Sequence, residues 1–328
     1  MNTFGRLFRV SIFGESHGSS VGVLIDGVPA GIPLSKDDFR KDLLRRKGGK
    51  FGTTKRVEED EPIIESGVFN GYTTGAPVLI RFENKDTRSR DYQDIRYIPR
   101  PGHADFVGFV KYKGFNDYRG GGHFSGRLTT GIVAAGVIAK KIIFPMNVHA
   151  HIEEIGGKRE DLGNVLSEAF QNGDSVGGII RCVVENVPVG LGEPFFDSVE
   201  SMLSHAMFSI PGVKAIEFGV GFEAARMRGS QYNDQYESHG KTKTNNSGGI
   251  NGGITNGNEI VFRIAVRPTA SISIPQESFD MLTGEKKQLV IGGRHDTCFA
   301  LRVPPIVEAM TSIVLADFKL IAKAYDVR

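Results

Sequence analysis

The sequence predicts an α+β protein built in layers. Strand-like and helix-like segments are mixed along the 328 residues, without the strict alternation that a doubly wound parallel sheet requires. The stretch 126–144 is apolar on nearly every side, as expected for a helix packed between other elements. Hydrophobic residues make up 40% of the chain, enough for a full core, and the length allows one large domain or two ordinary ones.

The first quarter of the chain is predicted to be mainly strands. Residues 6–13 and 21–25 have strand character, and residues 62–69 and 77–82 flank a turn-rich stretch typical of a hairpin. The exception is a short helix that begins near Ser35 and ends at about Lys47.

Helical spacing of apolar residues predicts further helices at 162–170 and 199–207, the second introduced by an Asp197/Glu200 capping pattern. The central helix follows Gly120-Gly121-Gly122 and stops before Pro145. The remaining expected elements are strands at 180–187, 213–218 and 260–266 and a last helix from Pro304 past Phe318.

Residues 229–258 are rich in Gly, Asn, Ser and Thr and show no periodicity. Long internal loops of this kind are usually functional or disordered. We favour a loop that closes over a ligand; the alternative is a mobile surface loop.

Composition excludes several classes of protein. The 40 basic and 38 acidic residues nearly balance, so nucleic acid is not the expected main partner. Two cysteines make no disulfide scaffold, and no signal-peptide pattern opens the chain. The longest apolar run, 128–139, is shorter than the roughly 20 residues that a bilayer requires. We expect a cytoplasmic protein without a membrane segment.

Two histidine islands are the most informative motifs: Gly14-Glu15-Ser16-His17-Gly18 and Arg100-Pro101-Gly102-His103-Ala104-Asp105. Glycine allows close backbone approach, arginine binds phosphate or carboxylate, and histidine moves protons near neutral pH. Together they predict acid/base chemistry on an anionic substrate. The first island also matches the G-x-S-x-G elbow of serine hydrolases, but a strand follows it where the elbow needs a helix.

Two further segments predict anion binding. Gly120 to Arg127 precedes the central helix, where free N–H groups attract phosphate; a glycine turn capped by Ser125 is the alternative. Residues 40–56 hold eight basic residues against one acid, which suits a multiply charged small molecule or RNA. Few aromatics are interleaved, which argues against single-stranded nucleic acid.

Three weaker patterns favour ordinary structure. Residues 219–224 form a G-x-G-x-x-A string without a following helical stripe, so a simple turn is preferred to a dinucleotide site. His149 and His151 lack further ligands nearby, so we expect no metal. Gly292-Gly293-Arg294-His295-Asp296 either supplies a base, Asp296, or is a turn in which Asp296 pairs with Arg294.

These islands together resemble the chorismate synthase family. The family's signature regions are matched by Gly14 to Gly18, by Asp117-Tyr118-Arg119-Gly120-Gly121-Gly122 leading to Arg127, and by Gly293 to Asp296. Residues 26–33, 100–105 and 190–194 are also similar, so the resemblance covers nearly the whole chain. It implies a single domain over residues 1–328, a β-α-β sandwich with helices between antiparallel sheets, and a homotetramer.

The resemblance also implies an activity and residue roles. The activity is conversion of 5-enolpyruvylshikimate 3-phosphate to chorismate by 1,4-anti elimination of phosphate with reduced FMN, a step of aromatic amino acid biosynthesis by the shikimate pathway. His17 would protonate the reduced flavin, His103 the departing phosphate, and Asp296 would help remove the ring proton. The implied substrate ligands are Arg46, Arg56, Arg100 and Arg127.

For FMN, the family pattern falls on small and polar residues in several segments. They are Phe124, Ser125, Gly126, Pro211, Gly212, Gly252, Arg267, Pro268, Thr269, Ala270, Ser271 and Arg294. Many relatives have Asn-Ala in place of Pro211-Gly212. Phe51-Gly52 stands where relatives often have an arginine, and the stretch between Ile155 and Asp174 is shorter than usual.

Two other functions remain open from the residues themselves. An NADPH-dependent flavin oxidoreductase would use the 219–224 string and the basic run, and an RNA-binding module would use residues 40–56. No convincing nicotinamide (NADP) site is found in the sequence. The source of reduced flavin therefore stays open between the protein itself and an external flavin reductase.

Overall fold

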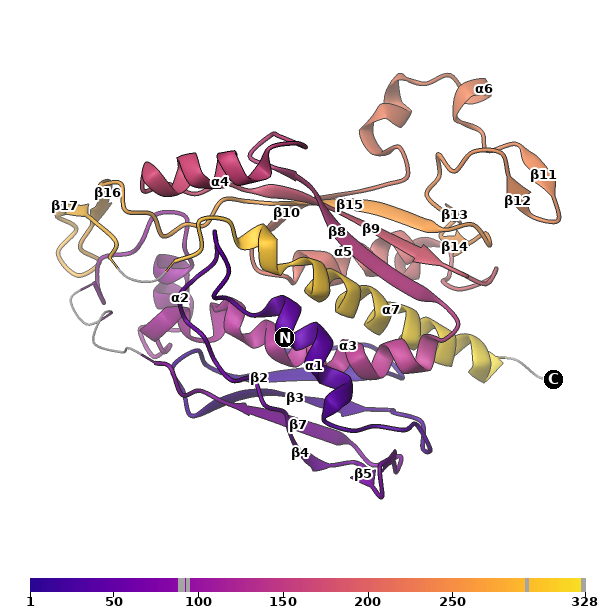
Figure 1. The fold of residues 1–328 in the computed structure, drawn as a ribbon, viewed down its shortest axis with the longest axis horizontal. Helices are drawn as coiled ribbons and strands as arrows, with labels where there is room; N and C mark the ends of the chain where they lie inside the picture. The colour runs from indigo at the N-terminus through magenta and orange to yellow at the C-terminus, as the bar shows by residue number, and fades with distance from the viewer. Residues whose placement is uncertain (88–91, 93–94, 293–294, 326–328) are drawn as a thin grey trace.

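A computed structural model describes residues 1–87, 92, 95–292 and 295–325. Its elements form three layers: a five-stranded sheet, a layer of helices and a four-stranded sheet (Figure 1). All strand pairs within both sheets are antiparallel. The α+β prediction, with helices between antiparallel sheets, is confirmed.

The first sheet comes from the N-terminal quarter of the chain and has the order β1-β2-β3-β7-β4. Alternation places Val21, Val23 and Ile25 on its buried face against the helices. The predicted hairpin is confirmed, because β4 pairs with β7 and the short β5 and β6 lie between them. The strands are β1 Thr3–Phe4, β2 Arg9–Gly14, β3 Ser20–Asp26, β4 Ile63–Ser66, β5 Val68–Phe69, β6 Tyr72–Thr73 and β7 Val78–Glu83.

The second sheet has the order β10-β15-β9-β8 and confirms the three strands predicted there. In β15 the buried side chains Ile260, Phe262 and Ile264 alternate with more exposed ones, as predicted from their period of two. Its strands are β8 Asn147–Ile155, β9 Gly178–Glu185, β10 Val213–Phe218 and β15 Ile260–Val266.

The middle layer contains α1 Asp37–Arg46, α3 Thr129–Ile143 and α7 Pro304–Tyr325. Helix α3 is buried along almost its whole length, as its composition predicts. It crosses α7 at Gly136, where a Cβ would lie 2.3 Å from the Cβ of Ala309. Glycine at this position therefore permits the close packing of the two central helices.

Three shorter helices surround these layers: α2 Asp105–Lys111, α4 Leu162–Gln171 and α5 Val199–Phe208. The predicted cap of α5 is wrong. Ser198 Oγ accepts the Ser201 N–H at 3.0 Å, whereas the carboxylate of Asp197 pairs with Arg6. Ser198 is the residue with extended backbone immediately before the helix, which is where a capping side chain must stand.

Residues 229–258 form an arm that projects from the second sheet (Figure 1). Asp234 organises it by accepting the N–H groups of Asn246 and Ser247. None of its residues lines the cavity described below, so the prediction that it closes over a ligand is wrong for its own chain. The arm contains α6 Gly229–Tyr232, β11 Tyr236–Ser238, β12 Lys241–Thr242, β13 Ile250–Asn251 and β14 Ile254–Thr255.

The G-x-G-x-x-A string leads into a 3₁₀ turn, η5 Gly221–Arg226, which confirms the preference for an ordinary turn. The other short elements are η2 Arg119–Phe124, η3 Gly126–Leu128, η4 Phe195–Asp197, η6 Phe299–Arg302, β16 Gln276–Phe279 and β17 Lys286–Leu289. Within the described ranges, no helix is long and apolar enough to cross a membrane.

Candidate active site

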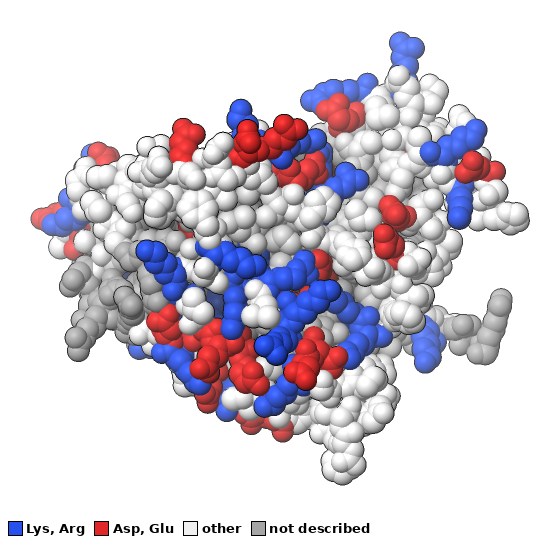
Figure 2. Space-filling model, viewed as in Figure 1, with Lys and Arg blue, Asp and Glu red and all other residues white. Residues whose placement is uncertain are grey.

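One cavity gathers residues from segments that are far apart in the sequence. His17, His103 and Asp296 line it together with Arg46, Arg56, Arg100 and Arg127, so the structure brings all seven predicted catalytic and substrate-binding residues to one place. Figure 2 shows Lys and Arg side chains around a hollow on this face, with acidic side chains beside them. The predicted anionic ligand therefore has a strongly cationic environment available.

The first histidine island forms the turn between β2 and β3. His17 meets the ring of Tyr92 edge-on, with centroids 5.3 Å apart. A Cβ on Gly120 would lie 2.5 Å from the His17 ring, so only glycine allows this approach. Because the strand β3 follows the turn, the hydrolase interpretation is excluded by geometry as well as by pattern.

The triple glycine forms a tight turn before the central helix. Gly120, Gly121 and Gly122 all have positive φ, at 59°, 79° and 51°. Ser125 then caps η3, with its Oγ accepting the Arg127 N–H at 3.3 Å. The guanidinium of Arg127 turns away from this helix start, toward Asp60. The segment therefore has the Ser125 cap and borders the cavity through Gly120, Ser125 and Gly126, so anion binding at this helix start stays a prediction.

Arg46 and Arg127 share one buried carboxylate. Asp60 Oδ2 accepts Arg46 Nη2 at 2.8 Å, its Oδ1 accepts Arg127 Nη1, and all three side chains are at most 4% exposed. Burial alone would raise the pKa of Asp60, but the two guanidinium charges outweigh it and hold the pKa below its ordinary value. The carboxylate therefore stays ionised and fixes two cations at the cavity wall.

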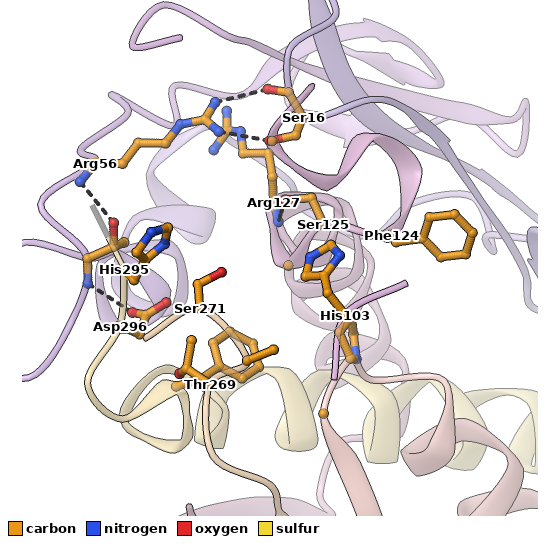
Figure 3. A pocket seen from close by; sticks show the side chains of 18 of the residues that line it. Ser16, Arg56, His103, Phe124, Ser125, Arg127, Thr269, Ser271, His295 and Asp296 are labelled. Carbon is orange, nitrogen blue, oxygen red and sulfur yellow. Dashed lines mark hydrogen bonds between the residues drawn. The ribbon is translucent and has the colours of Figure 1, made fainter. Parts of the chain in front are cut away.

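Arg56 is held in a similar way by its own neighbours. It donates to Glu58 at 2.7 Å, and also to the hydroxyl and the carbonyl of Ser16, at 2.8 and 3.0 Å (Figure 3). Glu58 additionally accepts the N–H groups of Lys85 and Asp86. These bonds overcome the effect of burial and keep the pKa of Glu58 low. Arg56 thus ties the first histidine island to the basic run.

The second histidine island folds back on itself. His103 Nδ1 lies 2.7 Å from Asp105 Oδ1, and Arg100 pairs with both oxygens of the same carboxylate at 2.8 Å. Arg100 Nη2 also lies 3.2 Å from His103 Nδ1 and 3.3 Å from Nε2. Burial raises the pKa of Asp105, but these partners lower it to well below its usual range.

Asp296 approaches the cavity from the segment before η6. Its Oδ1 accepts the N–H of Thr54 at 2.9 Å, and Arg302 lies 3.2 Å from Oδ2. Burial, reinforced by the charge of Arg100, lowers the pKa of the adjacent His295. Arg294, the partner that the sequence suggested for Asp296, lies outside the described residues. Among the described residues, Arg302 pairs with Asp296.

Further short and mostly uncharged segments line the same cavity. Of the twelve residues predicted for a flavin, ten line the cavity: Phe124, Ser125, Gly126, Pro211, Gly212, Arg267, Pro268, Thr269, Ala270 and Ser271. The Thr269 hydroxyl is buried without a hydrogen-bond partner among the described residues. Arg294 is undescribed, and Gly252 lies in the exposed β13–β14 turn of the arm, away from the cavity lining.

Sequence reasoning missed the carboxylates that organise the cations. Glu58 and Asp60 directly follow the basic run and belong to the acidic stretch 58–61, which was the available signal. Arg302, which lines the cavity beside Asp296, is a lone arginine before the last helix and carried no such signal.

The basic run divides in the folded chain. Arg46 and Arg56 turn into the cavity, whereas Arg45 pairs with the buried Glu308 at 2.7 Å. His149 and His151 are exposed on β8. In the described part of the chain, no group of three or more His, Cys, Asp or Glu residues could hold a metal ion.

Comparison with known proteins gives a consistent answer. The chorismate synthase family model matches residues 8–320. A chorismate synthase of Chitinophaga pinensis is 60% identical, with 98% of this chain and 97% of the relative covered, and one of Pyrococcus abyssi is 47% identical with 99% of each covered. A crystal structure of a chorismate synthase aligns with a TM-score of 0.75 at 28% identity, over 97% of this chain and 93% of that one. The chain belongs to the chorismate synthase family.

Proposed function

We propose that the cavity is the site where this lyase converts 5-enolpyruvylshikimate 3-phosphate to chorismate and phosphate with bound reduced FMN. Membership of the family carries the overall reaction. The observation that supports this location is the convergence of His17, His103, Asp296 and four arginines on one cavity. A substrate with a phosphate and two carboxylates is complementary to such a wall.

The arginines bind and orient the substrate. Arg46 is the strongest candidate ligand, because its Nε is buried without a hydrogen-bond partner among the described residues. Arg127 already donates to Asn84, Asp60 and the Glu83 carbonyl, so it has fewer N–H groups left for a ligand. Arg56 and Arg100 add charge at either side. Prearranged cations of this kind stabilise the negative charge that develops on the leaving phosphate.

The three titratable residues move protons. His103 donates a proton to the phosphate oxygen as the C–O bond breaks and its electron pair leaves with that oxygen. Asp296 accepts the proton lost from the ring, and its weak contact with Arg302 leaves lone pairs available. His17 holds a proton toward the flavin.

The uncharged wall suits FMN. The Thr269 hydroxyl, which is buried without a hydrogen-bond partner among the described residues, is the observation that fits a polar ligand, since such groups are normally hydrogen-bonded. Residues 124–126, 211–212 and 267–271 would hold the flavin, together with Arg294. When bound in its reduced form, FMN supplies the electron-rich ring that assists loss of phosphate.

We also propose a cytoplasmic homotetramer of a single domain per chain. The first sheet packs on α3, the second sheet packs on α7 and also contacts α3 through β8, and α3 and α7 pack on each other, which supports one domain. Phe195 and Phe196 are 86% and 91% exposed, which suits burial against another copy. In a tetramer, Gly252 would act in a neighbouring copy's cavity, because its own arm does not reach the cavity lining of its chain.

The test is phosphate release by the purified protein from the enolpyruvyl substrate under anaerobic conditions with chemically reduced FMN. Release that requires reduced FMN is expected, and its absence would show that the assignment is wrong. Adding NADPH in place of the chemical reductant tells whether the protein reduces its own flavin or requires an external reductase.

A further inference from the structure

The second histidine island ends in a carboxylate to which the reaction above gives no task. We propose that Asp105 is a positioning residue: its carboxylate accepts a hydrogen bond from His103 Nδ1–H and so fixes the imidazole. This leaves Nε2 as the nitrogen that transfers a proton. The inference rests on the proposed function, because it assigns His103 its acid role. It concerns a bond within the protein, however, and can be tested without any reaction.

Four donors converge on the carboxylate of Asp105. Oδ1 lies 2.7 Å from His103 Nδ1 and 2.8 Å from Arg100 Nη2. Oδ2 accepts the Arg100 backbone N–H at 3.0 Å and its Nε at 2.8 Å. An ionised carboxylate offers only acceptor sites, so a neutral His103 must carry its proton on Nδ1 to make this contact.

The surroundings confine the ring further. A Cβ on Gly121 would lie 3.2 Å from His103 Cε1, so the turn of η2 packs closely against that edge of the imidazole. Among the described residues, the charged and titratable groups that act on the ring are Arg100 and Asp105 from its own segment and His295 from the segment before η6. Of these three, Asp105 alone contributes negative charge, so it is the group that stabilises a protonated ring.

Replacing Asp105 by asparagine should reverse the tautomer. The amide keeps one acceptor oxygen and gains an NH₂ group, which cannot face a donor. The Arg100 N–H and Nε–H groups have no alternative protonation, whereas imidazole can exchange its proton between nitrogens. The amide oxygen should therefore keep the Oδ2 position, where it accepts the backbone N–H and Nε–H of Arg100. The NH₂ group then takes the Oδ1 position, displaces Arg100 Nη2 and donates to His103 Nδ1, which moves the ring proton to Nε2.

The first measurement is the ¹⁵N chemical shift pattern of His103 in the protein without flavin or substrate, at alkaline pH. The resonance is assigned with His103→Gln. We expect the Nδ1–H form in the parent protein and the Nε2–H form in Asp105→Asn. The same tautomer in both proteins would overturn the proposal, whatever reaction the protein catalyses.

The second measurement is a double-mutant cycle on phosphate release. Asp105→Asn should lower kcat by about 10²-fold or more, within the range for general acids, while KM changes by less than about threefold. In the His103→Ala background the same substitution should have almost no further effect, because Asp105 acts through the missing ring. Equal losses in both backgrounds, or parallel losses of kcat, KM and thermal stability, would show a merely structural role.

Asp38→Asn is the matched control. Asp38 also lies in the first turn of a helix, accepts a backbone N–H, from Ser35, and pairs with a cation, Lys141. It does not line the cavity. Its replacement should leave the His103 tautomer unchanged and kcat within about twofold, and an equal loss in this variant would count against a specific role for Asp105. A normal tautomer switch in a protein that releases no phosphate would refute the proposed function and leave the inference about Asp105 supported.

Discussion

The two walls of the cavity are built on different physical principles. On one side, guanidinium groups are held by carboxylates: Arg46 and Arg127 by Asp60, and Arg56 by Glu58. On the other, residues 267–271 and 211–212 present backbone, small side chains and the unpartnered hydroxyl of Thr269. The cationic wall is prearranged within the protein, whereas the second wall leaves polar groups for a ligand to satisfy. Substitution of the carboxylates at the first wall should therefore destabilise the protein, whereas loss of a donor that is left for a ligand, at either wall, should weaken binding.

The largest effect is expected for Asp60→Asn. Asparagine tolerates the positive φ of 55° at this position, so the change removes charge without backbone strain. Two buried guanidinium groups then lose their shared counter-charge, which should cost about 3 kcal/mol of unfolding free energy, measured by urea denaturation. Glu59→Gln is the control, because Glu59 pairs with Lys85 on the exposed surface and its replacement should change the unfolding free energy far less. Equal stability of the two variants would contradict the prearranged wall.

A smaller effect is expected for Arg46→Met, and it should fall on binding. The variant loses the buried Nε donor, which has no partner in the part of the chain that the structure describes, and a charged hydrogen bond contributes about 1.5–3 kcal/mol. The substrate KM should therefore rise by roughly 10- to 100-fold. Surface Arg40→Met, on the exposed side of the same helix, should leave KM unchanged. An unchanged KM in Arg46→Met would remove Arg46 from the substrate ligands.

Thr269→Val tests the second wall through two quantities, the stability of the flavin-free protein and the affinity for FMN. Removing a buried hydroxyl without a partner should leave the flavin-free protein equally or more stable. FMN affinity, measured by fluorescence quenching, should fall by about 3- to 10-fold, as for the loss of one neutral hydrogen bond. Thr269→Ser, which keeps the hydroxyl, is the control. Thr129→Val would not serve, because the Thr129 hydroxyl is already bonded to the Gly126 carbonyl. A loss of stability with unchanged FMN affinity would show that Thr269 supports the fold and does not bind the flavin.

Acidification should remove part of the same stabilisation as Asp60→Asn. Because the pKa of Asp60 is lower in the folded protein, its contribution is complete above the unfolded-state value of about 3.9 and is lost as the pH falls through the folded value. The unfolding free energy of the parent protein should therefore decrease more steeply below about pH 4 than that of Asp60→Asn. Parallel curves would show that Asp60 does not titrate differently in the folded state.

Local signals accounted for most of the fold. Period-two alternation located β15, strand-forming residues located β3, and the apolar composition of 126–144 identified α3 as the central helix. The errors arose where local pattern and tertiary contact compete. Asp197 resembles a cap, yet Arg6 lies close enough to pair with it, and Ser198 takes the capping position. The arm at 229–258 lacks periodicity because its order comes from hydrogen bonds to Asp234.

The site was less predictable than the fold. The resemblance selected residues that line the cavity, but it assigned no role to Asp60, Glu58 or Asp105, whose carboxylates hold the arginines and His103. Pairing of this kind joins segments across the chain, and the spacing of residues in a sequence does not encode such distances. Asp60 and Arg127, for example, are 67 residues apart.

Arg45 and Arg46 show where the sequence stops and tertiary structure begins. The sequence by itself determined that both are charged, that they end the same amphipathic helix, and that this helix belongs to a layered α+β protein of a recognisable family. Only the packing of α1 decided that Arg45 meets Glu308 of α7 while Arg46 meets Asp60 at the cavity. Consecutive helical residues point about 100° apart, so the neighbours that each one finds depend on the layers around the helix.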